Sequence, residues 1–222
     1  PHRFGDGQQY MLQENNEAKR LNRERLAKAE AAGKSLGGPK NGPAFESAPD
    51  SYSGYSDGAM IGNAREGLKR LAAGSQPFFL AVGFSKPHLP FNAPEEFWDL
   101  YDRDQIKLPG NPYPPKDVPD YALHTNGELR SYSRVPQKGD ITDDMTLELR
   151  HGYYACVSYI DSLLGDLMSD FDELGLRENT IIVFWSDHGF KLGEHSLWHK
   201  HTNFELDCRV PFMISAPGYR NG

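Results

Sequence analysis

Residues 180–189 read "TIIVFWSDHG" and place an acid and a histidine directly after an apolar run. A short, continuous apolar run of this kind predicts a buried strand of a parallel sheet. In open α/β sheets, ligands gather in the crevice beyond the carboxyl ends of the strands. Asp187 and His188 stand at that point, so this stretch predicts a fold class and a candidate site together.

Two further apolar runs, "PFFLAVGF" (77–84) and "VPFMISAPG" (210–218), predict two more buried strands. Between the strands, apolar residues recur at three- and four-residue steps. They predict one helix over about 59–73 that stops at Gly74, and a longer one that begins after Thr142 as N-cap and stops at Gly175. Helices alternating with strands predict an α/β fold with a mainly parallel sheet flanked by helices.

The chain divides by composition into two parts. Residues 1–58 are polar and predict an exposed helix followed by a Gly/Pro/Ser-rich connector, whereas residues 59–222 carry the periodic apolar segments of a domain. Inside that domain, residues 85–140 are rich in proline and show no sustained period. We expect a long insert that runs over the edge of the sheet and shapes a substrate pocket.

The length, net charge and composition of the chain exclude some classes of protein. With 222 residues the chain can bury a sizeable core, and its net charge of −7 argues against a nucleic-acid binder. No apolar run approaches the roughly 20 residues of a membrane span. The chain begins with Pro-His-Arg and not Met, so it carries no information on a leader. Cys156 and Cys208 form no metal-binding pattern, and we expect both as free thiols.

A divalent cation is one interpretation of Asp187 and His188. They offer a carboxylate oxygen and an imidazole nitrogen, and Gly189 permits a turn that lets both side chains converge. Two ligands do not hold such an ion alone, so others must come from elsewhere. The alternative is a structural Asp–His hydrogen bond that caps the next segment. A zinc peptidase is excluded, because no His-Glu-x-x-His pattern occurs.

Four ordered motifs extend the pattern: Lys86-Pro87-His88, Ser186-Asp187-His188-Gly189, Leu192-Gly193-Glu194-His195 and Trp198-His199-Lys200. Together they resemble the type I sulfatases of the alkaline phosphatase superfamily, and most closely the iduronate-2-sulfatase-like branch. The resemblance covers about residues 61–218, with residues 105–140 matching poorly. It implies an alkaline-phosphatase-like sulfatase fold, present in part, and a sulfuric ester hydrolase.

The resemblance also implies roles for single residues. Asp187 and His188 are similar to two ligands of the family's calcium ion, although a histidine ligand would also suit manganese or zinc. Lys200 is similar to the lysine that contacts the substrate's sulfate and assists the leaving group, and His88 to the histidine that protonates the leaving alcohol. Lys86 would form part of the wall against the substrate.

The polar residues that neighbour these positions are not expected to take part in the reaction. Glu194 and His195 are expected to orient the loop and not to touch substrate. His199 and His201 are expected as surface or packing residues.

The nucleophile implied by the resemblance is missing from this chain. The family uses a formylglycine made within Cys/Ser-x-Pro/Ala-x-Arg, and neither Cys156 nor Cys208 lies in such a motif. In the family this motif and two more metal-binding aspartates lie upstream of the matching stretch. We therefore expect the chain to be the downstream part of a larger catalytic domain, to need the missing upstream half as its partner, and to be inactive alone.

The expected substrate is a sulfated small molecule or glycan, such as a glycosaminoglycan. Two alternatives stay open: a phosphodiesterase or phosphonate monoester hydrolase of the same superfamily, and a catalytically silent binder of sulfated sugar. If the source is bacterial, the resemblance implies a periplasmic or secreted protein.

Overall fold

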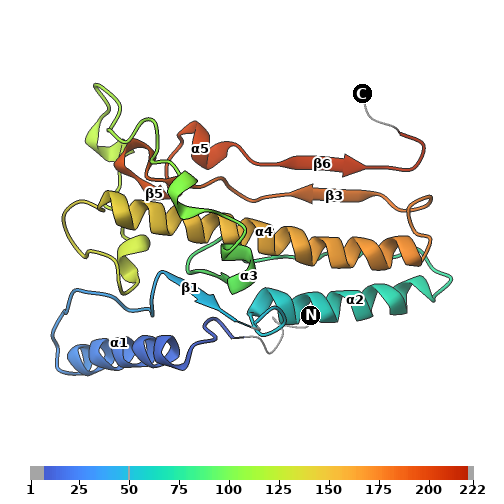
Figure 1. Ribbon diagram of the computed structural model, residues 1–222, viewed down its shortest axis with the longest axis horizontal. Helices are drawn as coiled ribbons and strands as arrows, with labels where there is room; N and C mark the ends of the chain where they lie inside the picture. The colour runs from blue at the N-terminus through green and yellow to red at the C-terminus, as the bar shows by residue number, and fades with distance from the viewer. Residues whose placement is uncertain (1–7, 50, 220–222) are drawn as a thin grey trace.

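The computed structural model describes residues 8–49 and 51–219 (Figure 1). Residues 1–7, 50 and 220–222 lie outside the described residues. The predicted segments 1–58 and 59–222 are therefore described except at these positions. The main elements, in chain order, are α1 (Gln13–Ala31), β1 (Phe45–Ala48), α2 (Ser56–Ala72), β2 (Phe91–Pro94), α3 (Glu95–Trp98), α4 (Asp143–Glu173), β3 (Ile182–Trp185), β4 (Lys191–Leu192), β5 (Trp198–His199), α5 (Glu205–Cys208) and β6 (Phe212–Ser215).

Helix α4 runs along the length of the molecule, and α2 lies beside its second half (Figure 1). The predicted ends are confirmed: the Thr142 side chain accepts a hydrogen bond of 3.2 Å from the Met145 N–H, and Gly175 follows the helix with a φ of +67°. Gly152 in α4 permits a close approach, since a Cβ there would lie 2.8 Å from the Trp98 ring. The predicted helix over 59–73 is confirmed as α2, which begins at Ser56.

The polar N-terminal segment is more ordered than its composition indicates. α1 is the predicted exposed helix, but the expected connector contains β1, which pairs in parallel with β2 and belongs to the core. Glu46 of β1 is only 2% exposed, and its carboxylate accepts hydrogen bonds from the Met11 and Leu12 N–H groups, from Asn15 and from Tyr55. A fully partnered buried carboxylate thus ties α1 and the start of α2 to β1.

The fold class is α/β as predicted, but the strands pair differently from the mainly parallel sheet expected. Among the strand pairs of the described residues, β1–β2 is parallel, whereas β3–β6 and β4–β5 are antiparallel. Residues 77–84 form no strand, although alternate side chains in this run point inward. The prediction of three fully buried strands is therefore wrong for the described residues.

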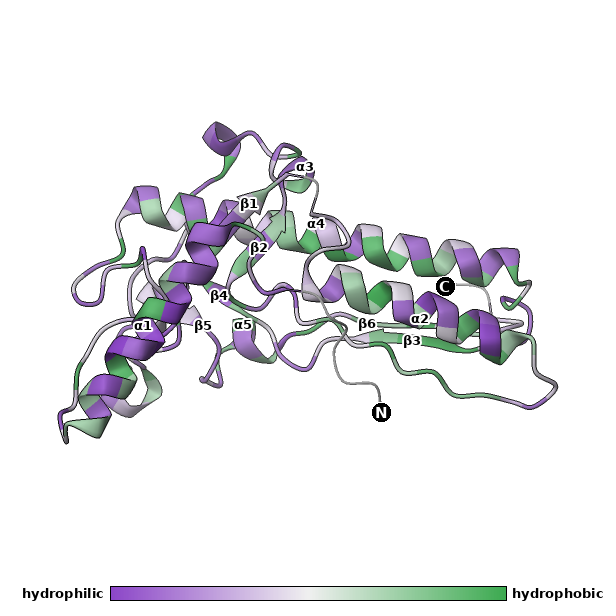
Figure 2. Cartoon of the chain, turned by 90° about the horizontal axis from the view of Figure 1, so that it is seen from below, coloured by the Kyte–Doolittle hydropathy of each residue, from purple (hydrophilic) through white to green (hydrophobic). Residues whose placement is uncertain are grey.

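The reason is that β3 and the run 77–84 are covered on only one face, while all four residues of β6 are exposed. Ile182 of β3 packs with Leu68 of α2 and Phe171 of α4, as do Phe78 and Leu80 from the run 77–84. The opposite face stays open: Trp185 is 62% and Phe79 89% exposed. Figure 2 shows β3 as a strongly apolar segment.

The insert 85–140 contains β2, α3 and three short 3₁₀ turns, and it packs against the segment of β4 and β5. The Asn126 side chain accepts a hydrogen bond from the Trp198 N–H at 2.9 Å and donates one to the Ser196 carbonyl at 3.1 Å. The insert is thus fixed over the motif that carries Lys200. Within the described residues, no helix combines the length and the apolar character that a membrane crossing takes.

Candidate functional site

The segment that carries Lys200 has an unusual backbone. Residues His195, Ser196, His199 and His201 all have left-handed φ angles, of 58°, 58°, 61° and 87°. For a residue with a Cβ this conformation costs roughly 1–2 kcal/mol. Such a run persists only when surrounding contacts determine it, and it is typical of functional sites.

A buried ion pair supplies those contacts. Lys191 is fully buried and bonds to the carboxylate of Asp207, which is 5% exposed. Asp207 also accepts from the Thr202 N–H at 2.8 Å, and Lys191 Nζ donates to the Thr202 hydroxyl at 3.0 Å. Burial alone would raise the pKa of Asp207, but the hydrogen bonds from Lys191 and Thr202 lower it. This network anchors the chain two residues beyond Lys200.

A second buried carboxylate fixes the loop that carries His88. Asp57, at the start of α2 and 3% exposed, accepts hydrogen bonds of 2.9 Å from the N–H groups of both Ser85 and Lys86. Lys86 Nζ in turn donates to the His88 carbonyl at 3.2 Å and to the Pro90 carbonyl. Burial lowers the pKa of Lys86.

These contacts bear on the expected substrate wall. Lys86 and His88 line one pocket, but the Lys86 ammonium already has two carbonyl partners. Its role against a substrate stays a prediction.

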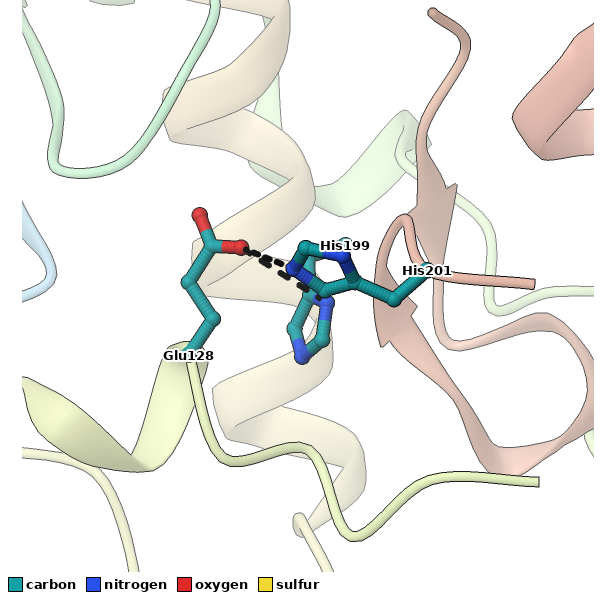
Figure 3. A group of neighbouring side chains, drawn as sticks. All are labelled: Glu128, His199 and His201. Carbon is teal, nitrogen blue, oxygen red and sulfur yellow. Dashed lines mark hydrogen bonds and ion pairs between the residues drawn. The ribbon is translucent and has the colours of Figure 1, made fainter. Parts of the chain in front are cut away.

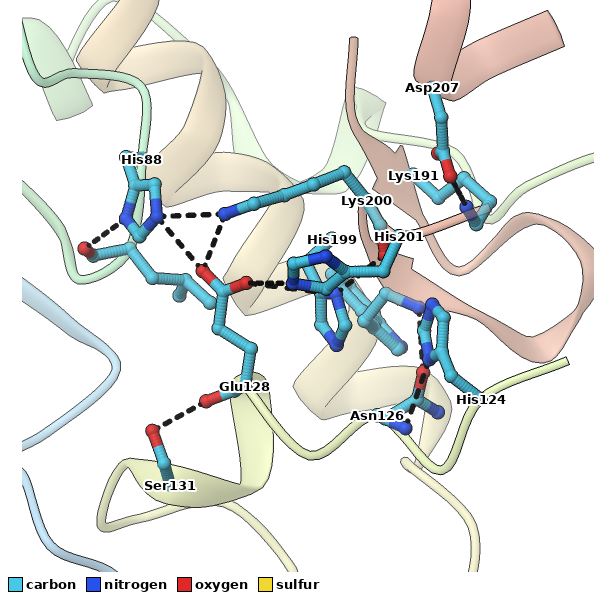
Figure 4. Close-up of polar contacts among 12 residues, drawn as sticks. His88, His124, Asn126, Glu128, Ser131, Lys191, His199, Lys200, His201 and Asp207 are labelled. Carbon is cyan, nitrogen blue, oxygen red and sulfur yellow. Dashed lines mark hydrogen bonds and ion pairs between the residues drawn. The ribbon is translucent and has the colours of Figure 1, made fainter. Parts of the chain in front are cut away.

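Lys200 and His88 meet at the junction of the two loops, from positions 112 residues apart (Figure 4). Lys200 Nζ lies 2.8 Å from His88 Nε2, and Glu128 Oε1 lies 2.9 Å from each of them. Burial alone would raise the pKa of Glu128, but the hydrogen bonds from His88 and Lys200 outweigh it and hold that pKa below its usual range. The three groups form one cluster in which Lys200 and Glu128 are mostly shielded from water, whereas the His88 side chain is 42% exposed.

The second oxygen of Glu128 faces two histidines (Figure 3). Oε2 lies 3.2 Å from His201 Nε2 and 3.7 Å from His199 Nδ1, and the ligand atoms of the three residues all lie within 4.8 Å of one another. This is close enough for a shared transition-metal ion. However, His199 Nδ1 also lies 2.9 Å from the Lys200 carbonyl, to which it donates, so this nitrogen is already engaged in a hydrogen bond.

His199 and His201 lie as expected, one packed and one on the surface. His199 is 2% exposed and stacks on His124 with ring centroids 4.3 Å apart. Burial, together with the neighbouring His124, lowers the pKa of His199 to about 4, so its ring is neutral near pH 7. The side chain of His201 is 60% exposed.

Asp187 and His188 stand together after β3. His188 Nδ1 lies 2.7 Å from the Gly189 carbonyl and donates to it, which leaves the lone pair on Nε2. That Nε2 lies 3.8 Å from Asp187 Oδ2, and the Asp187 side chain is 85% exposed. Metal-binding histidines commonly donate the other ring N–H to a carbonyl in this way, so both residues fit a cation that takes its remaining ligands elsewhere.

The candidate residues thus form two pairs. Lys200 contacts His88, and Asp187 faces His188, but no hydrogen bond or ion pair joins the two pairs in the part of the chain that the structure describes. The residue that the sequence did not indicate is Glu128, because it lies in the poorly matching insert and belongs to no motif.

Two of the remaining predictions near the site are confirmed, namely the loop-orienting contacts of Glu194 and the free thiols. Glu194 orients the loop: its carboxylate accepts the Leu192 N–H at 2.6 Å and pairs with Arg150 at 3.1 Å. Cys156 and Cys208 are both free thiols. Cys156 lies in α4, and burial raises its pKa to about 12, which makes it a poor nucleophile.

Comparison with known proteins identifies a family and relatives for this chain. The family model described as "Sulfatase" matches residues 2–220. Iduronate 2-sulfatase of Mus musculus is 41% identical over 157 residues, which cover 68% of this chain and 28% of that protein. The chain therefore spans just over a quarter of the length of this relative.

Two solved structures show the alkaline-phosphatase-like fold. The phosphonate monoester hydrolase of Silicibacter pomeroyi is similar with a TM-score of 0.63 and 21% identity, over 76% of this chain and 34% of that chain. A second structure, solved with its substrate D-glucosamine-2-N,6-O-disulfate, has a TM-score of 0.57 and 21% identity, over 73% and 43% of the two chains. These likenesses confirm the α/β fold class, and the match of the family model over nearly the whole chain shows that the chain belongs to the sulfatase family.

Proposed function

We propose that the chain is the downstream part of a metal-dependent sulfatase catalytic domain that hydrolyses sulfate esters. The observation that carries the proposal is the contact of 2.8 Å between Lys200 Nζ and His88 Nε2. It brings together a permanent positive charge and a potential proton donor from two of the four motifs. The sulfate ester of a sugar needs both, because its leaving group is a poorly stabilised alkoxide.

The two side chains have separable roles. Lys200 offsets negative charge on the transferred sulfate and on the leaving oxygen. His88 Nδ1 donates to the Leu89 carbonyl at 2.8 Å, so Nε2 is the ring atom that faces the leaving alcohol, and it delivers a proton when the ring is in its protonated form. With Lys200 beside that nitrogen, both groups act on the same oxygen.

Asp187 and His188 are proposed as two ligands of the sulfatase metal ion, with calcium first and manganese or zinc as alternatives. When bound, the ion supplies positive charge against the sulfate oxygens. The donated hydrogen bond from His188 Nδ1 to Gly189 supports this role, since it turns Nε2 toward Asp187.

The nucleophile and the remaining metal ligands are proposed to come from an upstream segment with a formylglycine. The open face of β3, β6 and residues 77–84 supports such a partner, because large apolar side chains such as Trp185 and Phe212 are 62% and 65% exposed there. Strands of the upstream segment would pair with the free edges and cover these side chains.

The proposed substrate is a sulfated glycan. It is supported by the name of the mouse relative, iduronate 2-sulfatase, and by the structural neighbour solved with a disulfated glucosamine. In a bacterial source, the protein would act in the periplasm or outside the cell.

A phosphonate monoester hydrolase is the rival that a specific observation favours, namely the structural likeness to the Silicibacter pomeroyi enzyme. Parallel assays of the full-length protein on 4-nitrophenyl sulfate and on an aryl phosphonate monoester separate the two functions. We expect the higher kcat/KM on the sulfate. A higher kcat/KM on the phosphonate would contradict the proposal, and turnover of neither ester would favour a silent binder.

A further inference from the structure

Glu128 stands where a substrate oxygen would have to lie. Its Oε1 is 2.9 Å from Lys200 Nζ and 2.9 Å from His88 Nε2, and these two nitrogens are 2.8 Å apart. The three atoms form a nearly equilateral triangle of hydrogen-bond contacts. While the carboxylate stays there, no other oxygen can accept from both nitrogens at once.

An oxygen with the same two partners is what the proposed reaction requires, since the ester oxygen must meet both Lys200 and His88 as its bond to sulfur breaks. We propose that Glu128 is a specificity-determining residue whose carboxylate occupies the ester-oxygen position until a substrate displaces it. This inference rests on the proposed function, and it adds a competing ligand, built into the chain, to the site.

The surroundings of Glu128 allow the carboxylate to leave without moving the loop. The Glu128 carbonyl accepts a hydrogen bond of 2.7 Å from the Ser131 hydroxyl, and Asn126 holds the other side of the loop to Ser196 and Trp198. The second oxygen, Oε2, lies 3.2 Å from the exposed His201. A carboxylate that gives up Lys200 and His88 therefore keeps a partner at the rim.

The arrangement selects among anions. Glu128 belongs to the same chain as Lys200 and His88 and therefore competes at a high effective concentration, so an anion that meets only these two residues is held weakly. A sulfate ester that is also bound by other parts of the enzyme displaces Glu128 more readily. Free sulfate, the product, is then released more easily than substrate.

Glu128→Asp and Glu128→Gln in the full-length protein test the inference. The aspartate keeps the charge but is one methylene shorter, so its carboxylate withdraws from Lys200 and His88. The Kd for inorganic sulfate is measured by isothermal titration calorimetry, with KM and kcat for 4-nitrophenyl sulfate beside it. In the wild type, Glu128 either contacts Lys200 and His88 or has left them. If the first state is favoured by about ten to one, both variants bind sulfate about tenfold more tightly and KM falls.

Glu17→Gln is the control, because Glu17 pairs only with Arg20 on α1, and its Kd for sulfate should equal that of the wild type. Circular dichroism and a urea midpoint show that each variant is folded. Tightening in the glutamine variant alone would mean that only the charge matters, and it would overturn the inference, as would weaker sulfate binding in both. Unchanged binding beside wild-type turnover of the sulfate ester would overturn the inference and leave the proposed function standing. Tighter binding without turnover would support it while the proposed function failed.

Discussion

Lys200 extends from a backbone that is strained on both sides, since His199 and His201 have φ angles of 61° and 87°. The side chain is only 15% exposed, and its two polar contacts are His88 and Glu128. A charge so shielded acts more strongly on a bound sulfate than a solvated one would. We therefore expect Lys200 to contribute to the reaction through its charge.

We expect Lys200→Ala to lower kcat of the full-length enzyme on 4-nitrophenyl sulfate by roughly 10²–10³, the scale for the loss of one charge-stabilising donor. Lys107→Ala is the control, because Lys107 is exposed in the insert. Steady-state kinetics of the two variants check this. An equal loss in both, or a change in KM alone, would remove Lys200 from the chemistry.

Asp187→Asn should lower the metal content of the purified full-length protein, because an amide oxygen without charge binds a divalent cation less well than a carboxylate. Elemental analysis by mass spectrometry measures the content per chain. Asp161→Asn, at an exposed position in α4, should leave it unchanged. Equal metal in all three proteins would count against Asp187 as a ligand.

At the scale of elements, ion pairs centred on Asp170 join helices α2 and α4. Arg65 of α2 bonds to both oxygens of Asp170 in α4, at 2.6 and 3.0 Å, and Lys69 adds a contact of 3.3 Å. Asp170 is 2% exposed. The hydrogen bond from Arg65, outweighing burial, lowers the pKa of Asp170 to about 2. The contact helps to hold α2 and α4 over the inner face of β3.

Asp170→Asn should lower the free energy of unfolding by about 1–3 kcal/mol near pH 7, the range for hydrogen bonds to charged groups. A depressed carboxyl pKa stabilises the fold above the unfolded pKa of roughly 4, and this contribution is lost as pH falls toward 2. Urea midpoints of wild type and variant should therefore converge over this window. Asp172→Asn, which disrupts an exposed pair with Arg177, is the control with little effect. A difference that stays constant from pH 7 to pH 2 would contradict the assignment.

The elements also show what sequence can predict. Helix α4 was predictable because its signals are local: the Thr142 cap, the apolar period and Gly175 all lie within the helix or at its ends. The burial of β3 and β6 was not, because an apolar run does not reveal whether a second layer covers it. His88, Lys200, Asp187 and His188 were predictable from motifs. Glu128 was not, since only the folded insert brings it to them.

At the scale of the whole molecule, the proposed upstream segment would account for two features, the open apolar face and the absence of a formylglycine motif from the sequence. A chain with Trp185, Phe212 and Ile214 more than half exposed presents a surface that soluble proteins normally cover. The upstream segment proposed here would cover this face and complete the site.

The 222 residues alone should accordingly show no turnover of 4-nitrophenyl sulfate, with or without added calcium, because their sequence contains no formylglycine motif to supply the expected nucleophile. Co-expression with the upstream segment and a formylglycine-generating enzyme should restore it. Turnover by the isolated chain, lost in Lys200→Ala, would show that a nucleophile lies within these residues.

The central claim is that His88 and Lys200 act together on the leaving oxygen, and leaving-group dependence tests it most directly. In the full-length enzyme, kcat/KM of wild type and His88→Ala is compared on 4-nitrophenyl sulfate, whose leaving group needs no proton, and on a sugar sulfate, whose alkoxide does. We expect His88→Ala to lose about 10²–10⁴ on the sugar sulfate, the scale of general acid catalysis, and far less on the aryl ester. Equal losses on both esters would contradict the claim.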